Sequence, residues 1–448
     1  MCYILITGCN ISFCGFIFRI ERMRTMREKD NKNRGITLIA LVVTIVVLLI
    51  LAGISISMLT GQNGILNRAA EAKEKTEVSS KDEQRKLARA EALMNTEKTT
   101  YKGVTLPEGF APTKIDGEDS VDDGLVITDG YGNEYVWVEV PIAEVFSGVS
   151  IENTKEMTDN DYKTIQGKLQ EYVADYNNSS YYDVWYANDD GKTITEETDG
   201  LTERQKELKN GCGLSYYEYK SAYRSMLKSI YSYGGFWIGR YETGIYGSVT
   251  DTTIARISHT DVSVGTSPKG IVQKNAIPYN NIYCSEAQNI ANEISTNSNY
   301  RSSLLFGIQW NLVCKYLEND TMLSIKSLNS DSSCFGNYSN KEITIKNLNA
   351  KKFKDDNWSK MDENKKEGSL LLSTGASEYT KKMNIYDFAG NEWEWTLEKT
   401  QYVNFPCTSR GGNFSNSGEK TPAASYNNNS SINAGYTGIG FRVTIYEK

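Results

Sequence analysis

The chain has 448 residues, with 49 lysine and arginine side chains against 56 aspartate and glutamate, a formal net charge of −7 and 39% hydrophobic residues. A chain of this length and composition can bury a substantial core, and its acidic balance argues against a nucleic-acid-binding protein. The single histidine, His259, excludes sites that need two histidines, and the eight cysteines lack the close pairs of a zinc ribbon.

The first 35 residues bear on which methionine is the true start of the protein. Residues 1–20 contain an apolar stretch, CYILITGCNISFCGFIF, that does not suit the leader of an exported protein. A start at Met23 or Met26 leaves a short basic leader that ends MREKDNKNRG. Our interpretation is that residues 1–35 are a leader and that residues 1–25 belong to an over-extended reading frame. In that case Cys2, Cys9 and Cys14 do not exist in the protein.

The next segment is apolar enough to enter a membrane. Residues 36–59 read ITLIALVVTIVVLLILAGISISML and carry no charge. At about 1.5 Å per residue, a helix of this length spans about 36 Å, more than the hydrocarbon core of a bilayer. A basic flank precedes it, which places that side in the cytoplasm. A simple signal anchor is one interpretation; an ordinary secretory signal fits less well, because its apolar region is usually about 7–15 residues.

The junction before this segment resembles the class III signal of type IV pilins and pseudopilins. The residues that carry the resemblance are NRG at 33–35 followed by ITLIALVV. The resemblance implies that prepilin peptidase cuts after Gly35, that Ile36 is methylated, and that residues 36–59 serve as membrane anchor and later as filament core. Many relatives have Phe in place of Ile36 and Glu in place of Ala40. Filament incorporation therefore stays open.

Residues 60–100 are predicted to continue as a charged helical stalk. Between Arg68 and Lys98, 15 of 31 residues are ionisable, which is typical of a solvated surface. Leu87, Ala90 and Met94 follow one another at the spacing of a helix face.

Strand and turn signals dominate from Tyr101, so residues 101–448 are predicted to form an α+β domain. Residues 124–140 favour a hairpin around the turn DGYGN, closed by Pro141. An insertion at about 145–230 carries two predicted helices, one around residues 162–172 and one around 216–230 that ends at Gly234. Its tyrosines either pack the insertion onto the domain or form a binding surface. Further helices are predicted near Ser285, with Gln288 at capping-box spacing, and around residues 309–312.

Six segments of this domain, in order, resemble the formylglycine-generating enzyme (sulfatase-modifying factor) family. They read VWVEVP, FWIGRYETG, LLFGIQWN, NIYDFAGNEWEWT, RGG and GFR. The resemblance implies a C-type-lectin-like fold. Active members oxidise a substrate cysteine with copper held by two cysteines shortly after RGG. The family spacing falls here on Asn416 and Thr421, and Cu(I) prefers thiolates, so we expect neither copper nor oxidase activity.

The same resemblance implies a structural Ca²⁺ site. The matching positions are Asp387, Gly390, Glu392 and Glu394. Ca²⁺ takes 6–8 hard oxygen ligands, which a turn that enters a strand can present. In the alternative interpretation Asp387 only caps a turn and Glu394 faces solvent, while the tryptophans on either side of it enter the core.

The stretch 413–433 is rich in asparagine and serine, which supply 11 of its 21 residues. We predict a ligand-binding face here, because Asn, Ser and Tyr combine adaptable hydrogen bonding with aromatic contact. The candidate residues are Asn413, Asn416, Tyr426 and Asn428 within the stretch, and Tyr436 close by. A loop that satisfies itself with Asx turns is the alternative.

Taken together, the sequence predicts a single-pass membrane protein whose carboxyl-terminal domain is displayed outside the cell, alone or on a surface filament. Expected partners are prepilin peptidase, the membrane, other pilin-like subunits and an extracellular ligand, without nucleic acid. The predicted function is non-catalytic recognition or adhesion. A minor pseudopilin of a pilus or secretion machine and an exported enzyme are the alternatives. Five cysteines remain in the mature chain, so at least one thiol lacks a partner within the molecule.

Overall fold

The computed structural model describes residues 40–52, 65–178, 181–182, 211–246, 269–297, 299–355, 357–400, 407–430 and 435–448. Residues 40–52 are helical, within the predicted membrane segment 36–59. The other residues of that segment lie outside the described part, as do the leader with Gly35 and Ile36, and His259. Within the described residues, none of the helices combines the length and the apolar character needed to cross a bilayer.

The chain divides into two compact units, residues 1–80 and residues 81–448. Helix α3 (Ile65–Met94) contains the boundary, so its last 14 residues belong to the second unit, which we call the head. Within the head, α3 packs through two small side chains, Ala88 and Ala92, which are 4% and 1% exposed. Leu87 and Met94 of the predicted stripe are exposed instead. The two alanines, rather than Leu87 and Met94, are therefore the buried apolar side chains of this part of α3.

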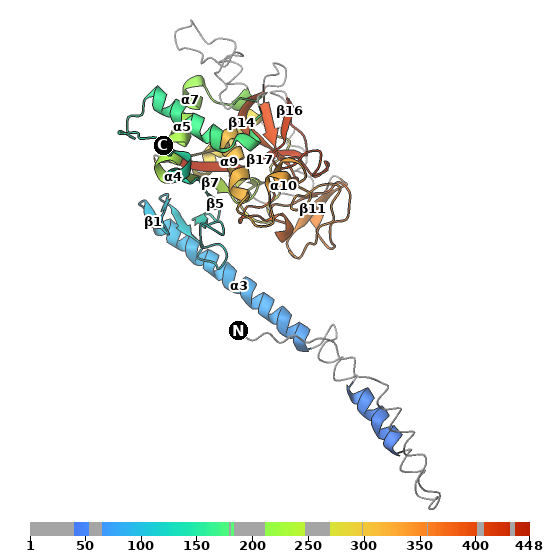
Figure 1. Ribbon diagram of the computed structural model, residues 1–448. Helices are drawn as coiled ribbons and strands as arrows, with labels where there is room; N and C mark the ends of the chain where they lie inside the picture. The colour runs from blue at the N-terminus through green and yellow to red at the C-terminus, as the bar shows by residue number, and fades with distance from the viewer. Residues whose placement is uncertain are drawn as a thin grey trace, which may run out of the picture. The chain divides into compact units, whose positions relative to one another are not determined.

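Within the described residues, six strands of the head form an antiparallel sheet in the order β10-β18-β7-β5-β4-β3. Their bounds are β3 (Phe110–Pro112), β4 (Val126–Asp129), β5 (Glu134–Glu139), β7 (Gly235–Gly239), β10 (Tyr300–Leu304) and β18 (Val443–Glu447). The predicted hairpin is confirmed as β4 and β5. Strand β18 pairs with both β10 and β7, so the carboxyl-terminal strand lies inside the sheet. The next two strands, β7 and β5, are labelled in Figure 1.

A second sheet has the order β16-β15-β14-β17 among the described strands, with β6 also paired to β14. The bounds are β6 (Tyr181–Tyr182), β14 (Trp393–Thr400), β15 (Cys407–Arg410), β16 (Tyr426–Ser430) and β17 (Ile439–Phe441). Strands β14 and β17 are parallel, and Trp395 lies opposite Phe441. The GNEWEW and GFR segments, far apart in the sequence, are therefore neighbours.

Shorter strands form three small sheets in the described part of the head. Their bounds are β1 (Thr99–Tyr101) with β2 (Val104–Leu106), β8 (Gly244–Ile245) with β9 (Gly270–Ile271), and β11 (Lys351–Lys354) with β12 (Asn357–Lys360) and β13 (Leu371–Leu372).

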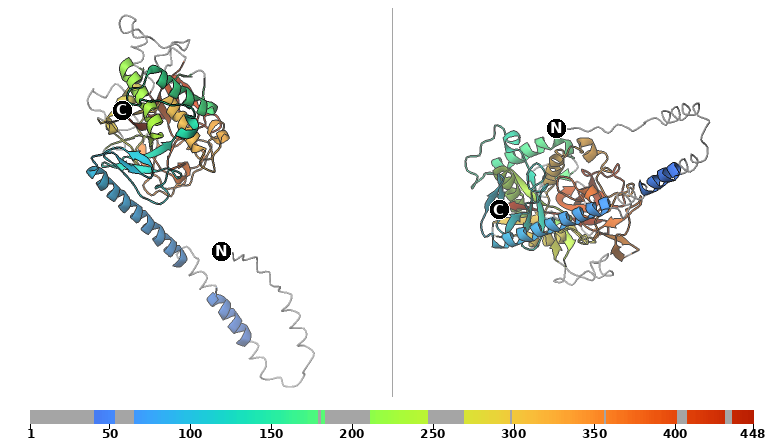
Figure 2. Two further views of the ribbon diagram at one scale, coloured as in Figure 1. Left: turned by 60° about the vertical axis from the view of Figure 1, so that its left-hand side comes forward. Right: turned by 90° about the horizontal axis from the view of Figure 1, so that it is seen from below.

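Helices cover the sheets. Their bounds are α4 (Ile142–Val145), α5 (Asp159–Tyr172), α7 (Tyr216–Tyr233), α8 (Cys284–Ser295), α9 (Gly307–Leu317) and α10 (Ile325–Asn329), with short 3₁₀ turns η1 (Ala174–Tyr176) and η2 (Glu378–Thr380). Helices α5 and α7 lie together on one side of the head, away from the sheet that contains β11 (Figure 2). Helix α9 contacts both β5 and β14, so it connects the two main sheets.

The predicted helices of the insertion are confirmed. Ile165 and Leu169 of α5 are buried, and α7 ends at Gly234, whose φ of 79° is left-handed. The buried tyrosines of α7 are Tyr216, Tyr219 and Tyr223, so the packing interpretation holds for these three.

The predicted cap of α8 is wrong. The carboxylate of Glu286, not the Gln288 side chain, accepts a hydrogen bond from the backbone N–H of Tyr283, at 3.2 Å. Gln288 is buried and accepts from the backbone N–H of Leu304 instead.

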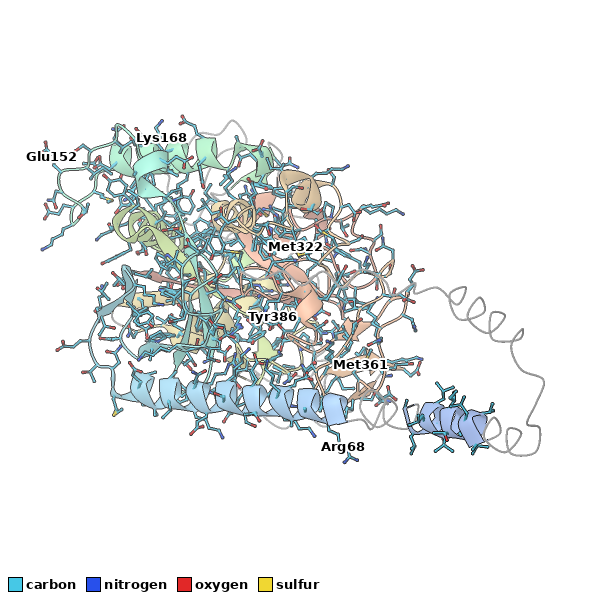
Figure 3. All side chains as sticks on the ribbon, turned by 60° about the horizontal axis from the view of Figure 1, so that its bottom comes forward. Arg68, Glu152, Lys168, Met322, Met361 and Tyr386 are labelled. Carbon is cyan, nitrogen blue, oxygen red and sulfur yellow. The ribbon has the colours of Figure 1, made fainter. Side chains whose placement is uncertain are left out.

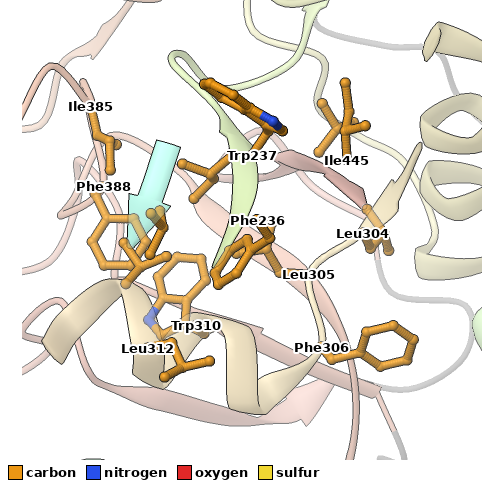
Figure 4. Close-up of a cluster of buried hydrophobic side chains, with 14 of the residues drawn as sticks. Phe236, Trp237, Leu304, Leu305, Phe306, Trp310, Leu312, Ile385, Phe388 and Ile445 are labelled. Atoms are coloured by element: carbon orange, nitrogen blue, oxygen red, sulfur yellow. The ribbon is translucent and has the colours of Figure 1, made fainter. Parts of the chain in front are cut away.

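The hydrophobic core lies between the sheets and around α9 (Figure 4). Trp310 of α9 is fully buried and stacks on Phe388 with ring centroids 4.2 Å apart. Its indole N–H donates to the backbone carbonyl of Ala423 at 3.0 Å, so its polar atom is satisfied in the core.

Candidate functional site

Three arginines of the family-like segments are buried, and each is paired with carboxylates. Arg240, from FWIGRYETG, donates to Glu134 at 2.9 Å and to Glu118 at 2.8 Å. Arg442, from GFR, donates to Glu394 at 2.7 Å. A buried charge needs such partners, because an unpaired one is costly. These arginines therefore hold the fold together rather than line an open site.

Arg410 of the RGG segment follows the same pattern. Its guanidinium donates to Glu398 at 3.1 and 2.9 Å and to the Asn311 side chain at 2.8 Å. It also lies 3.6 Å from the ring centroid of Tyr426. The RGG motif thus joins β15 to α9.

All four predicted calcium positions are buried, in the segment that follows Tyr386, whose place in the head is labelled in Figure 3. The Asp387 carboxylate accepts hydrogen bonds from the Gly375 N–H and the Thr380 hydroxyl, both at 2.7 Å. Glu394 is paired with Arg442 and is 1% exposed, so the alternative in which it faces solvent is wrong. Both carboxylates already have protein partners.

Glu392 differs from these two acids. Its side chain is buried, and neither carboxylate oxygen accepts a hydrogen bond of standard geometry among the described residues, although the Asn280 amide lies close to them. The backbone N–H of Glu392 donates to Glu242 at 3.1 Å, and the Asn391 amide donates to the same carboxylate at 2.5 Å. Burial and the neighbouring acids raise the pKa of Glu242 well above its usual value. Burial also raises the pKa of Glu392.

Backbone geometry explains why this segment turns so tightly. Asp387, Gly390 and Asn391 have φ values of 55°, 72° and 57°. Asp, Asn and Gly are the residues that tolerate this left-handed region best. At Gly390 an added Cβ would lie 2.4 Å from the backbone carbonyl oxygen of Asn337.

No group of three or more His, Cys, Asp or Glu side chains with a metal-holding arrangement occurs in the part of the chain that the structure describes. If a cation bound at the predicted positions, Glu392 would be the carboxylate most available as a ligand. Glu394 could become a ligand only by giving up its ion pair with Arg442. The calcium site stays a prediction.

The two positions that correspond to the oxidase cysteines are used in turns. The Asn416 side-chain oxygen accepts from the Asn413 N–H at 3.2 Å, and the Thr421 carbonyl accepts from the Tyr338 hydroxyl at 2.8 Å. The absence of copper and of oxidase activity stays a prediction.

The predicted ligand-binding residues separate into two groups. Asn413 is buried and donates to the Gly438 carbonyl at 3.2 Å, and Tyr436 beside it is 41% exposed. Tyr426 begins β16 and donates to the Tyr176 carbonyl at 2.7 Å. Asn428 lies in β16, and its side chain is outside the described part. Internal hydrogen bonds hold Asn413, Asn416 and Tyr426, whereas Tyr436 is open to solvent.

Sequence reasoning missed a cationic hollow between α5 and α7. It encloses about 370 Å³, and its lining includes Tyr162, Tyr217, Lys220, Arg224, Lys228 and Lys448. We call it the basic groove.

The basic groove follows from the register of α7. Three of the four cations of the groove, Lys220, Arg224 and Lys228, recur every four residues of α7, so they share one face of the helix. Arg224 contacts Asp159 at 2.5 Å and lies 5.0 Å from the ring centroid of Tyr162. The four-residue spacing was visible in the sequence, but the partner helix that turns it into a hollow was not.

The amino-terminal sequence matches a known family profile, the prokaryotic N-terminal methylation motif, over residues 30–56. The chain carries a prepilin-type signal. The matched range contains Gly35 and Ile36, so the predicted resemblance at this junction is confirmed. Such a signal is the substrate of prepilin peptidase and indicates a membrane-anchored, pilin-like exported protein.

Comparisons of the whole chain with curated proteins and with solved structures give little information about the head. No curated protein matches it. Among solved structures it is similar to one titled "Crystal Structure of CarF", with 13% identity and a TM-score of 0.27 over 48% of this chain and 87% of that one. A similarity at this level carries no argument about fold or function. The enzyme-family resemblance and the lectin-like fold stay predictions.

Proposed function

We propose that this protein is a pilin-like surface protein whose head recognises an anionic polysaccharide without catalysing a reaction. The observation that carries the first part is the methylation motif at residues 30–56. The apolar helix then anchors the chain, and the head is displayed outside the cell, alone or in a filament. A lectin-type head related to formylglycine-generating enzymes, with Asn416 and Thr421 in place of the copper-binding cysteines, suits this role.

The basic groove supports an anionic ligand. Its cations stand out in a chain with a net charge of −7, and three of them share one face of α7. Burial and the positive charge of the nearby Arg301 both lower the pKa of Lys448, so a further cation lies beside the groove. Guanidinium and ammonium groups bind carboxylate and sulfate strongly.

The aromatic lining favours a sugar polymer over a small free anion. Tyr217 is exposed, and Tyr162 lies beneath the Arg224 guanidinium. Tyrosine offers a flat apolar face together with a hydroxyl group, which suits a sugar ring. A polysaccharide carboxylate would replace Asp159 as a partner of Arg224, an exchange that the exposed position of Asp159 allows.

The test is binding of the purified full-length protein, in detergent, to polygalacturonate and to neutral dextran. We expect saturable, salt-sensitive binding to polygalacturonate only, because exposed charge pairs weaken as salt increases. The double variant Arg224→Gln with Lys228→Gln should lose at least about tenfold in affinity, a difference of about 1.4 kcal/mol. Lys163→Gln on the exposed side of α5 is the matched control. Equal binding of dextran, or equal loss in the control, would contradict the proposal.

A minor pseudopilin is the second candidate, because the same methylation motif serves both roles. It differs from the first in its partners. Chemical cross-linking in cells followed by purification should capture pilus-assembly components if the protein enters a filament, and should return the protein alone from the membrane fraction if it does not.

A further inference from the structure

Three buried cysteines meet in the head although they are far apart in the sequence. Cys212 precedes α7, Cys284 begins α8 and Cys407 begins β15, and each is at most 1% exposed. Spacing in the sequence gave no indication of this thiol cluster.

Strand β14 brings the cluster together. The Cys284 thiol donates to the Thr396 carbonyl, with 3.6 Å between sulfur and oxygen. On the other side, the Thr396 hydroxyl donates to the carbonyl of Thr408, the residue after Cys407, at 3.2 Å. In the antiparallel pairing of β14 with β15, Cys407 lies opposite Lys399 of β14. The first turn of α8 and the first residue of β15 therefore approach one point on β14.

The thiols of Cys284 and Cys407 are within hydrogen-bonding reach of each other, and Cys212 is close enough to act on Cys284 electrostatically. The Cys407 thiol also donates to the carbonyl of Gly211, next to Cys212, at 3.4 Å. Cys314 and Cys334, by contrast, do not belong to this arrangement: Cys314 lies in α9, and Cys334 is exposed.

We propose that Cys284 and Cys407 form a disulfide in the exported protein, which ties α8 to β15, while Cys212 remains a thiol. The inference rests on the proposed function in one respect, because export brings the head into an oxidising compartment. All three residues are thiols in the structure, and Cys284 and Cys407 are chosen because their thiols hydrogen-bond to each other.

The oxidation proceeds by exchange with an external disulfide, either a small molecule or a thiol–disulfide oxidoreductase. One cysteine loses its proton and attacks a sulfur of the external disulfide, which breaks and releases one thiol. The second cysteine then loses its proton and displaces the other sulfur. The external disulfide gains two electrons and two protons, and the protein gains one sulfur–sulfur bond.

The timing follows from burial. The hydrogen bond with Cys407 and burial raise the pKa of the Cys284 thiol well above its usual value, so the reactive thiolate is rare once the head is closed. The bond therefore forms during folding after export.

The test is peptide mapping of the full-length protein isolated from the membrane fraction. The protein is denatured, alkylated without reductant and digested, and the expected result is a linked pair of peptides that contain Cys284 and Cys407, with Cys212 alkylated. A link that includes Cys212 would overturn the proposal, as would alkylation of all three residues both here and in the refolded protein described next.

Two further arms separate this proposal from the proposed function. Protein refolded with oxidised and reduced glutathione should form the same link, whatever its location in the cell. A link in glutathione but not in cells would count against export, whereas no link in either would overturn the disulfide. The variant Cys284→Ala with Cys407→Ala should lower the unfolding temperature in non-reducing buffer. The variant Cys334→Ala, at an exposed position, is the control and should not.

Discussion

Arg85 is predicted to fix the end of α3 to the rest of the head. Its guanidinium contacts Glu118 at 2.8 Å and Glu134 at 3.0 Å, and its side chain is 21% exposed. Arg240 contacts the same two carboxylates, at 2.8 and 2.9 Å. The cluster therefore contains two positive and two negative charges and is neutral as a whole.

Replacing Arg85 with methionine keeps much of the side-chain volume and removes one charge. The two carboxylates then share Arg240 alone, so one negative charge stays largely buried without compensation. Breaking a buried ion pair costs about 3–5 kcal/mol. Because Arg240 still contacts both acids and Arg85 is partly exposed, we expect Arg85→Met to lower the free energy of unfolding by about 2–3 kcal/mol.

Lys114→Met is the matched control. Lys114 contacts Glu91, which like Arg85 belongs to α3, at 2.8 Å, and about half of each of these two side chains is exposed. Exposed pairs contribute about 0–1 kcal/mol, so this variant should unfold almost like the wild type. Urea unfolding of the full-length protein in detergent, followed by tryptophan fluorescence, measures both. Equal destabilisation by the two variants would refute the assignment of Arg85 to a buried cluster.

The same cluster predicts a pH dependence. Burial opposes ionisation of Glu118, but the guanidinium groups of Arg240 and Arg85 outweigh it and lower the pKa of this carboxyl. A lowered folded-state pKa contributes stability that is present above the unfolded-state value, about 4.3, and is lost as pH falls through the folded-state value. The difference between wild type and Arg85→Met should therefore narrow below about pH 4.

Two further outcomes are expected. Gly390→Ala should destabilise the head by at least about 1–3 kcal/mol, because the φ of Gly390 is 72° and the new Cβ would lie 2.4 Å from the Asn337 carbonyl oxygen. Gly167→Ala is the control, because a Cβ at this position of α5 meets no atom within 4 Å, and equal unfolding temperatures for the two variants would contradict the prediction. If calcium binds at residues 387–394, a free concentration one hundred times its dissociation constant should add about 2.7 kcal/mol to the free energy of unfolding. Glu392→Gln should remove that gain, and calorimetry that shows no difference between calcium and chelator in the wild type would refute the site.

The local elements of the head could be predicted from the sequence, because their signals are local. The spacing of Ile165 and Leu169 predicted the helix that is now α5, and Gly234 correctly predicted the end of α7. The turn DGYGN gave the hairpin β4–β5. In each case a few adjacent residues carry the whole signal, so no knowledge of the partner element was needed.

The features of the candidate site could not be predicted from the sequence, because they depend on contacts between residues that are far apart along the chain. Glu394 alternates with two tryptophans and therefore seemed free to face solvent, but Arg442, from the neighbouring strand region, provides its buried partner. The cysteine cluster and the basic groove share this origin, since each combines residues from separate elements. The capping error at α8 is of another kind: Glu286 and Gln288 both suit a cap, and only the buried contact of Gln288 with β10 decides between them.

The amino terminus of the mature protein tests the central claim most directly. Mass spectrometry of the protein purified from membranes should give a chain that begins at Ile36, with a methyl group on its amino terminus, because the methylation motif covers this junction. A chain that still carries residues before Ile36 would contradict prepilin-type processing and reduce the apolar segment to a simple anchor.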